Sequence, residues 1–138
     1  MSYATTIAAL VDKLETLSSP PPVLKYAPTA VHTTPVITVF FGSAERVDAG
    51  QVTGIRYAIV IRLILAWQDF EAAENQLEPY VDSIPALLRA DRHLGLTGAS
   101  APLVQIEEMT IEGGWIEIAG VTYRTVDFTV PILEKQVG

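Results

Sequence analysis

The sequence of 138 residues contains no cysteine, only two histidines, and nine lysine or arginine residues against 16 aspartate or glutamate residues. The absence of cysteine excludes disulfides, thiolate catalysis and cysteine-ligated zinc. The net charge of −7 is the reverse of the basic surface with which proteins hold nucleic-acid phosphates. Composition therefore favours an acidic protein that does not bind DNA or RNA through the phosphate backbone.

Long hydrophobic runs and targeting signals are missing as well. The most apolar stretch, 55–67, is interrupted by Arg56 and Arg62 and is shorter than the roughly 20 residues that a membrane-spanning helix needs. Residues 1–10 lack the basic and apolar regions of a signal peptide. We expect a protein kept in the cytoplasm until it meets its partners. With 49% hydrophobic residues, the chain can form one domain over 1–138.

The N-terminal pattern predicts a short helix followed by a proline-rich segment. Apolar residues recur at the three-and-four spacing of one helix face, namely Ile7, Leu10, Val11, Leu14 and Leu17. Prolines 20–22 end this helix, because proline lacks the amide proton that a helix requires. The segment 18–35 then has two interpretations: a polyproline-like connector on the surface, or an arm that packs against a neighbouring subunit.

The middle of the chain predicts strands. Residues 36–41 are β-branched and aromatic, and 44–53 are polar and predict an exposed loop. Residues 54–67 alternate strictly, with Tyr57 to Trp67 on one face and Arg56 to Ala66 on the other. Such a strand is roughly 40 Å long at about 3.3 Å per residue. We expect it to extend past its own domain and to need a partner.

A second helical pattern follows from Asp69, which is a suitable N-cap, to Ala90. Pro79 and Pro85 lie inside it, and each removes a backbone hydrogen bond. The pattern predicts a break or kink near Pro79, or a second helix that begins at this proline.

The C-terminal third predicts a β-meander. Its expected parts are a strand over 103–111 with an irregularity at Glu107–Glu108, a tight turn at Gly113–Gly114, a strand over 115–118, a turn at Ala119–Gly120 and a strand over 121–130 closed by Pro131. The predicted fold class is α+β: a mainly antiparallel sheet with the N-terminal helix and a kinked central helix packed on one face.

Motifs for catalysis or cofactor binding are weak. Gly98–Pro102 lacks the final glycine of a nucleophile elbow, and no phosphate-binding glycine loop is present. Asp91 and His93 could supply metal ligands, but such a pair more often marks the C-terminal end of a helix. The acidic residues at 107, 108, 112 and 117 are typical of a solvated hairpin. We therefore expect no enzyme, no cofactor and no metal.

Four residues are candidates for a subunit interface. Trp67 and Trp115 are of the type enriched in binding hot spots, although each could instead pack in the core. Arg56 and Arg62 share one strand face, where they are either ion-pair partners of a neighbouring subunit or exposed charges of little energetic value.

The order of several short motifs resembles a known family. They are Gly54-Ile55-Arg56-Tyr57 leading to Arg62-Leu63, the Glu71–Pro85 helix with its Pro-Tyr-x-Asp-x-Ile-Pro ending, the Asp-x-x-Leu-Gly turn at 91–95, and the Gly-Trp and Gly-Val-Thr-Tyr segments at 114–123. Together these resemble the tail terminator, or tail completion, proteins of long-tailed double-stranded DNA bacteriophages.

This resemblance implies a structural virion protein of α+β fold that forms a six-membered ring. The ring would cap the head-proximal end of the tail tube, stop its growth and join it to the neck proteins of the head. The implied partners are copies of the chain itself, the tail tube protein and a neck or head-completion protein. Genome DNA would pass through the ring without specific binding, and no membrane would be involved.

Other functions remain open from the sequence. Another neck component, such as a head-closure or connector subunit, or a tail-tube subunit, is compatible with a small acidic α+β chain. A small enzyme or ligand-binding domain is a more distant alternative, and it would need a concave pocket. In that case the side chains of His32 or His93 would be required for its activity.

Overall fold

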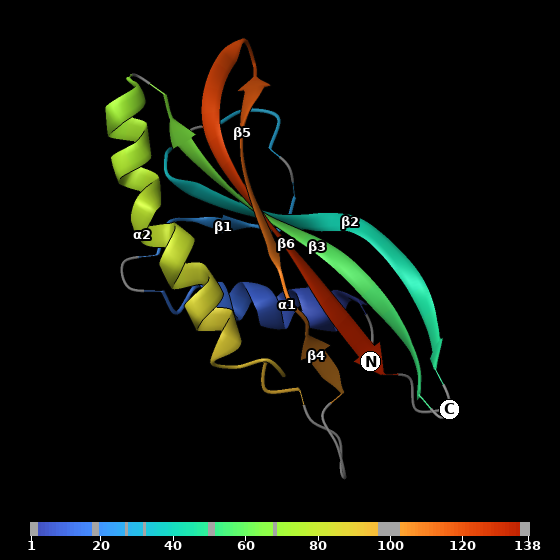
Figure 1. The fold of residues 1–138 in the computed structure, drawn as a ribbon. Coiled ribbons are helices and arrows are strands. Elements are labelled where there is room, and N and C mark those ends of the chain that lie inside the picture. Colours follow the sequence, from blue (N-terminus) through green and yellow to red (C-terminus); the bar gives the residue numbers. More distant parts are fainter. Residues whose placement is uncertain are drawn as a thin grey trace.

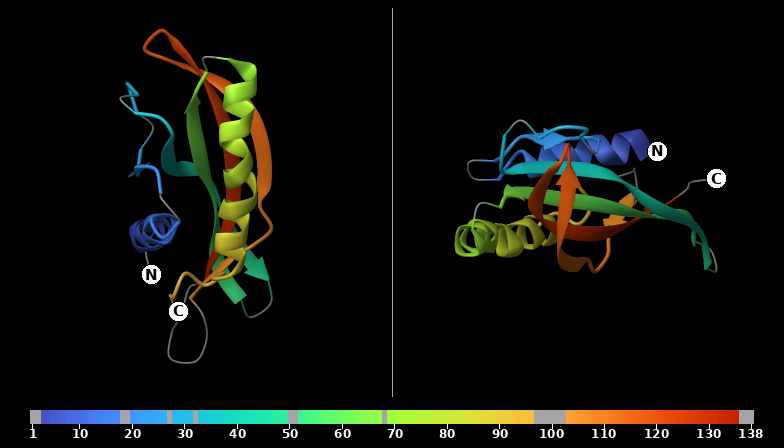
Figure 2. Two further views of the ribbon diagram at one scale, coloured as in Figure 1. Left: turned by 90° about the vertical axis from the view of Figure 1, so that its left-hand side faces the viewer. Right: turned by 90° about the horizontal axis from the view of Figure 1, so that it is seen from above.

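The computed structural model describes residues 3–17, 20–26, 28–31, 33–49, 52–67, 69–96 and 103–135. Within these ranges a strongly twisted six-stranded sheet carries two helices (Figures 1 and 2). The elements are α1 (Tyr3–Leu14), β1 (Val23–Leu24), β2 (Val36–Ala49), β3 (Val52–Ala66), α2 (Phe70–Arg89), β4 (Val104–Ile106), β5 (Thr110–Ile118) and β6 (Val121–Lys135). The strand order is β1-β2-β3-β6-β4, with β5 also paired to β6. All pairings except β1–β2 are antiparallel, which confirms the predicted α+β class.

Both helices pack on the same face of this sheet. One core cluster joins α1, through residues such as Leu10 and Leu14, to α2, through Ile84 and Leu88, and to the sheet. The face that carries the helices is called the inner face below, and the opposite one the outer face. The apolar residues predicted to share one helix face, Ile7, Leu10, Val11 and Leu14, therefore do form the buried side of α1.

The alternation in β3 places its residues as predicted. The side chains at odd positions from Tyr57 to Leu65 are buried on the inner face, whereas Arg56, Ala58, Val60 and Arg62 on the outer face are partly exposed. The expectation that this strand lacks partners within its own subunit was wrong, because β2 and β6 are nearly as long, although the far ends of β2 and β3 do project beyond the helices. Both β2 and β6 pair with β3 over its length, from Gly54 to Ala66 on the β6 side.

The polar segment 44–53 is not a loop. It forms the far part of a long β2–β3 hairpin that projects beyond the helices (Figure 1). The local sequence is polar because both of its faces meet solvent, and pairing with β3 is what makes it extended. A bulge lies between Phe41 and Ser43, where a side chain on Gly42 would come within 2.7 Å of the Ala58 carbonyl oxygen.

Gly113 and Gly114 do not form the predicted turn but lie inside β5, opposite Val126 and Thr125. A Cβ on Gly113 would lie 3.1 Å from the Arg124 guanidinium, so the glycine leaves room for that side chain. The tight turn between β5 and β6 is at Ala119–Gly120, as predicted, and both residues have positive φ.

Pro131 does not close the last strand, because β6 continues to Lys135. On the edge of β6 away from β3, Ile106 faces Ile132 and Thr110 faces Thr129, so one extra residue lies between β4 and β5. This confirms the irregularity predicted at Glu107–Glu108. The Pro131 carbonyl accepts a hydrogen bond from the Glu107 amide at 2.8 Å. The missing amide proton of Pro131 thus falls at a bulge, where proline is tolerated.

Helix α2 is continuous from Phe70 to Arg89 through both prolines, and it bends along its length in Figure 1 rather than breaking at Pro79. An internal proline costs about 3 kcal/mol. Burial of Leu77, Ile84 and Leu88 against the sheet offsets that cost. The Asp69 side chain accepts a hydrogen bond from the Ala72 amide at 2.8 Å, so the predicted N-cap is confirmed.

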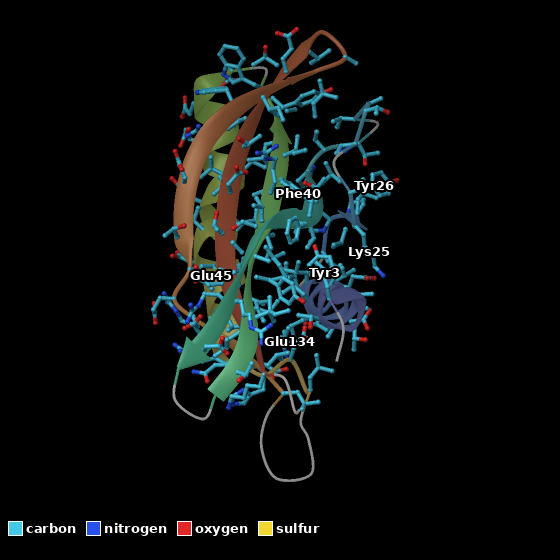
Figure 3. The ribbon with its side chains drawn as sticks, turned by 90° about the vertical axis from the view of Figure 1, so that its right-hand side faces the viewer. Tyr3, Lys25, Tyr26, Phe40, Glu45 and Glu134 are labelled. Carbon is cyan, nitrogen blue, oxygen red and sulfur yellow. The ribbon has the colours of Figure 1, made fainter. Side chains whose placement is uncertain are left out.

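The described part of the proline-rich segment lies against its own subunit. Leu24 and Val31 pack on an outer-face cluster formed by Val36, Ile64 and Ile118. This is what the connector interpretation predicts. Tyr26, which Figure 3 labels on this segment, is 60% exposed. Contact of the segment with a neighbouring subunit stays a prediction.

The tyrosines between α1 and the sheet make stability sensitive to high pH. The Tyr3 and Tyr57 rings lie 5.2 Å apart. Burial raises the pKa of Tyr57 above the usual value near 10, with a smaller contribution from the charge of Glu134. Burial likewise raises the pKa of Tyr3, with a smaller effect from Tyr57.

Since folding disfavours ionisation of these phenols, their contribution is fully present below pH about 10 and is lost as pH rises through the raised values. We expect the free energy of unfolding, measured with urea, to fall above that pH. The fall should be shallower in Tyr57→Phe. An identical alkaline slope in the variant would contradict this assignment.

Candidate assembly surfaces

Arg62 is held by partners within its own chain. Its Nε and Nη2 atoms donate to the two carboxylate oxygens of Asp127 at 2.8 and 2.9 Å. Its guanidinium also lies 5.1 Å from the centre of the Phe40 ring. The hydrogen bonds to Asp127 raise the pKa of Arg62 above its ordinary value. This residue links β3, β6 and β2 on the outer face.

Arg56, six residues before Arg62 on the same face, joins three parts of the chain. Its Nη1 donates to Glu45 of β2 at 2.8 Å, and its Nε donates to Glu107 in the bulge between β4 and β5. These hydrogen bonds, above all those with Glu107, raise the pKa of Arg56. The predicted role of both arginines at a subunit interface stays a prediction, since each is already paired inside the subunit.

Trp67 and Trp115 meet each other at the surface. Their ring centres are 4.7 Å apart in an edge-on arrangement, and each residue is 46% exposed. The core alternative for these residues is therefore wrong. Arg124 lies 4.8 Å from the Trp115 ring centre and forms an ion pair with Glu74 of α2 at 3.0 Å. The Arg124 Nη1 also donates to the Gly114 carbonyl at 3.0 Å, so the guanidinium that contacts Trp115 is held in place.

The four predicted residues do not form one site. Trp115 and Arg124 face each other across β5 and β6, on the inner face beside the start of α2. Arg56 and Arg62 lie on the outer face of β3. Arg124 and Glu74 carry no signal in the sequence, because their pairing joins residues 50 positions apart.

Two further features, also missed from the sequence, are the free edges of the sheet. Beyond Thr38, the edge of β2 away from β3 has no strand partner among the described residues. Likewise, within those residues β5 pairs only with β6. Each edge carries a large exposed apolar residue: Phe41 (52% exposed) on β2 and Ile111 (43%) on β5. Unpaired backbone and exposed apolar side chains together are typical of surfaces that bind protein.

The pair Arg62–Asp127 allows a quantitative test of the outer face. Both side chains are less than a third exposed. We expect Asp127→Asn and Arg62→Met each to lower the free energy of unfolding by about 1–2 kcal/mol, because each leaves a partly buried partner unsatisfied. A double-mutant cycle by urea denaturation should give a coupling energy of about 1 kcal/mol. Purely additive losses would show that the two-oxygen contact contributes nothing.

The residues considered for catalysis or metal binding lie only partly within the described segments. The Nδ1 of His93 lies 3.0 Å from the Val104 carbonyl oxygen, so this ring ties the end of α2 to β4. His32 and Gly98–Pro102 lie outside the described residues. Among the described residues no cluster of three or more acidic or histidine side chains could hold a metal. Helices of the described segments are all too short or too polar to cross a membrane.

Comparisons with known proteins find a likeness in fold. No family model and no curated protein matches the sequence. Among solved structures, the chain is similar to a chain in the virion of a native gene transfer agent particle, with a TM-score of 0.54. The match covers 98% of this chain and 100% of that one. The two share a fold. At 16% identity, the likeness concerns the fold alone.

Proposed function

We propose that this chain is a structural virion protein that forms a ring at the head-proximal end of a phage tail tube. There it ends tube growth and joins the tail to the neck of the head, as the resemblance to tail terminator proteins implies. The observation that carries the proposal is the fold shared, over almost the whole of both chains, with a chain of a virion. The proposed location is the tail–neck junction of the virion.

The surfaces of the subunit support an assembly role. Two sheet edges that lack a strand partner among the described residues, together with a half-exposed tryptophan pair, leave apolar surface for other chains. One hollow of about 280 Å³ is lined mainly by the proline-rich segment, including Pro22, Leu24 and Val31. A second hollow, of about 480 Å³, gathers Arg56, Arg92, Glu107 and Glu108, whose charges pair with one another.

The distribution of charge supports passage of DNA without binding. Six of the nine basic side chains form ion pairs with carboxylates of the same chain, and these are Lys13, Arg46, Arg56, Arg62, Arg92 and Arg124. An acidic ring with its cations neutralised would repel phosphates and let a genome slide. A ring whose bore is lined mainly by unpaired basic residues would contradict this part of the proposal.

The decisive experiment measures mass. Multi-angle light scattering of the purified protein, alone and mixed with tubes of the tail tube protein from the same particle, should show a closed oligomer in at least one condition. Electron microscopy should place this ring at one end of the tube. A chain that stays monomeric with and without tubes, or that polymerises into tubes itself, would overturn the proposal; the second result would favour the tail-tube alternative.

A further inference from the structure

We propose that the ring is closed by pairing the free edge of β2 in one subunit with the free edge of β5 in the next. This inference rests on the proposed function, and it names the occupant of the two edges as a second copy of the chain. It makes the sheets of adjacent subunits continuous through backbone hydrogen bonds.

The two edges differ, and this decides the kind of assembly. β2 and β5 lie toward opposite sides of the sheet, with β3 and β6 between them (Figure 2). Pairing of like edges gives a two-fold dimer and leaves the other edge free. Pairing of unlike edges is heterologous, so every subunit uses both edges and the chain of subunits can close into a ring.

The exposed apolar residues support pairing of these edges to each other. Phe41 faces Ile59 across β2 and β3, which places it on the inner face. Ile111 faces Phe128 and Trp115 faces Arg124, so both also lie on the inner face. When the two edges join with their inner faces aligned, Phe41 of one subunit lies on the same face of the joined sheet as Ile111 and Trp115 of the next. Aromatic and aliphatic cross-strand pairs stabilise a sheet.

Exposure supports the same pairing, whereas charge does not distinguish the two edges. β5 carries Glu112 and Glu117 and no basic residue, and the far part of β2 carries Arg46 together with Glu45 and Asp48. Arg46 is matched within its subunit only by the exposed Asp48, at 3.5 Å, a pair of little energetic value. All but the last residue of β5 are exposed or half-exposed. Natural edge strands commonly carry lysine or proline, which hinder pairing with another strand. β5 carries neither residue.

Because the chain contains no cysteine, any disulfide in a cross-linking test must form between introduced residues. On the outer face, Ser43 and Glu45 of β2 and Thr110, Glu112 and Ile116 of β5 lie at alternating positions. Six double variants combine Ser43→Cys or Glu45→Cys with Thr110→Cys, Glu112→Cys or Ile116→Cys. Together these pairs test consecutive alignments of the two strands in which the outer faces match. They do so for both parallel and antiparallel pairing. The Cα atoms of residues opposite each other in neighbouring strands are about 4.5–5.5 Å apart, a distance that a disulfide can bridge.

Under mild oxidation of the assembled protein, we expect at least one double variant to give a ladder of covalent oligomers up to the size of the ring. Each single variant, and Ser43→Cys combined with Glu78→Cys on the exposed side of α2, should stay monomeric on a denaturing gel. The ladder is expected to weaken by more than tenfold when Phe41→Ser is added, while light scattering reports whether the ring itself persists.

Several outcomes would overturn the inference. A ring seen by light scattering that yields no ladder with any of the six pairs would show that other surfaces join the subunits, and the proposed function would survive. Dimers from Ser43→Cys alone would show pairing of β2 with β2. Absence of any assembled species, with or without tubes, would reject the proposed function and this inference together.

Discussion

Replacing Ile61 with aspartate is expected to abolish folding. Ile61 is fully buried at the centre of the inner face, where its neighbours across β2 and β6 are Val39 and Phe128. The core there has no group to pair with a carboxylate, and an unpaired buried charge costs several kcal/mol or more. This is comparable to the whole stability of a domain, which is about 5–15 kcal/mol. Circular dichroism should show an unfolded chain or insoluble protein.

The neighbouring residue provides the control. Val60 lies on the outer face, is partly exposed and precedes Arg62 by two positions on the same face. Val60→Asp should therefore retain a native spectrum and a cooperative urea transition, because the new carboxylate meets solvent and a nearby guanidinium. Equal loss of folding in both variants would refute the assignment of the two faces.

The second large effect is expected at Phe128, which has no exposed surface and is among the largest fully buried side chains. Phe128→Ala removes a ring from the point where β3, β5 and β6 meet. Such truncations cost about 3–5 kcal/mol through lost burial and the cavity left behind. Urea denaturation should show this loss as a lower midpoint with an unchanged slope.

Ile111 faces Phe128 directly across β5 and β6 and makes a matched comparison, since it is 43% exposed. Ile111→Ala should cost less than about 1 kcal/mol in the isolated subunit. If this side chain serves a neighbouring subunit, the same variant should lower the yield of rings. Two equal losses of subunit stability would mean that Ile111 belongs to the core.

The sequence predicted those parts of the fold in which local pattern and tertiary structure agree. The alternation from Tyr57 to Leu65 assigned the faces of β3, and the three-and-four spacing assigned the buried side of α1. It could not predict where polar residues are extended. Between 44 and 53 the chain is a strand because β3 lies beside it, and no local signal records that partner.

The errors at glycine and proline have the same origin. Gly113–Gly114 can form a turn, but in this fold it leaves room for the guanidinium of Arg124. Pro131 commonly ends a strand, but here its missing amide proton falls at a bulge of the neighbouring chain segment. The sequence did not decide whether the two tryptophans are buried or exposed. The free edges depend on strand order, which only the fold provides.

The central position of β6 has a consequence for synthesis. This strand pairs with β3, β4 and β5, and its Glu134 accepts a hydrogen bond from Thr6 of α1 at 3.3 Å; Figure 3 shows Glu134 near that helix. It is also translated after every other described element. A nascent chain therefore cannot complete its sheet until β6 has left the ribosome. Subunits still being translated would be unable to join one another prematurely, and association would be reserved for finished molecules.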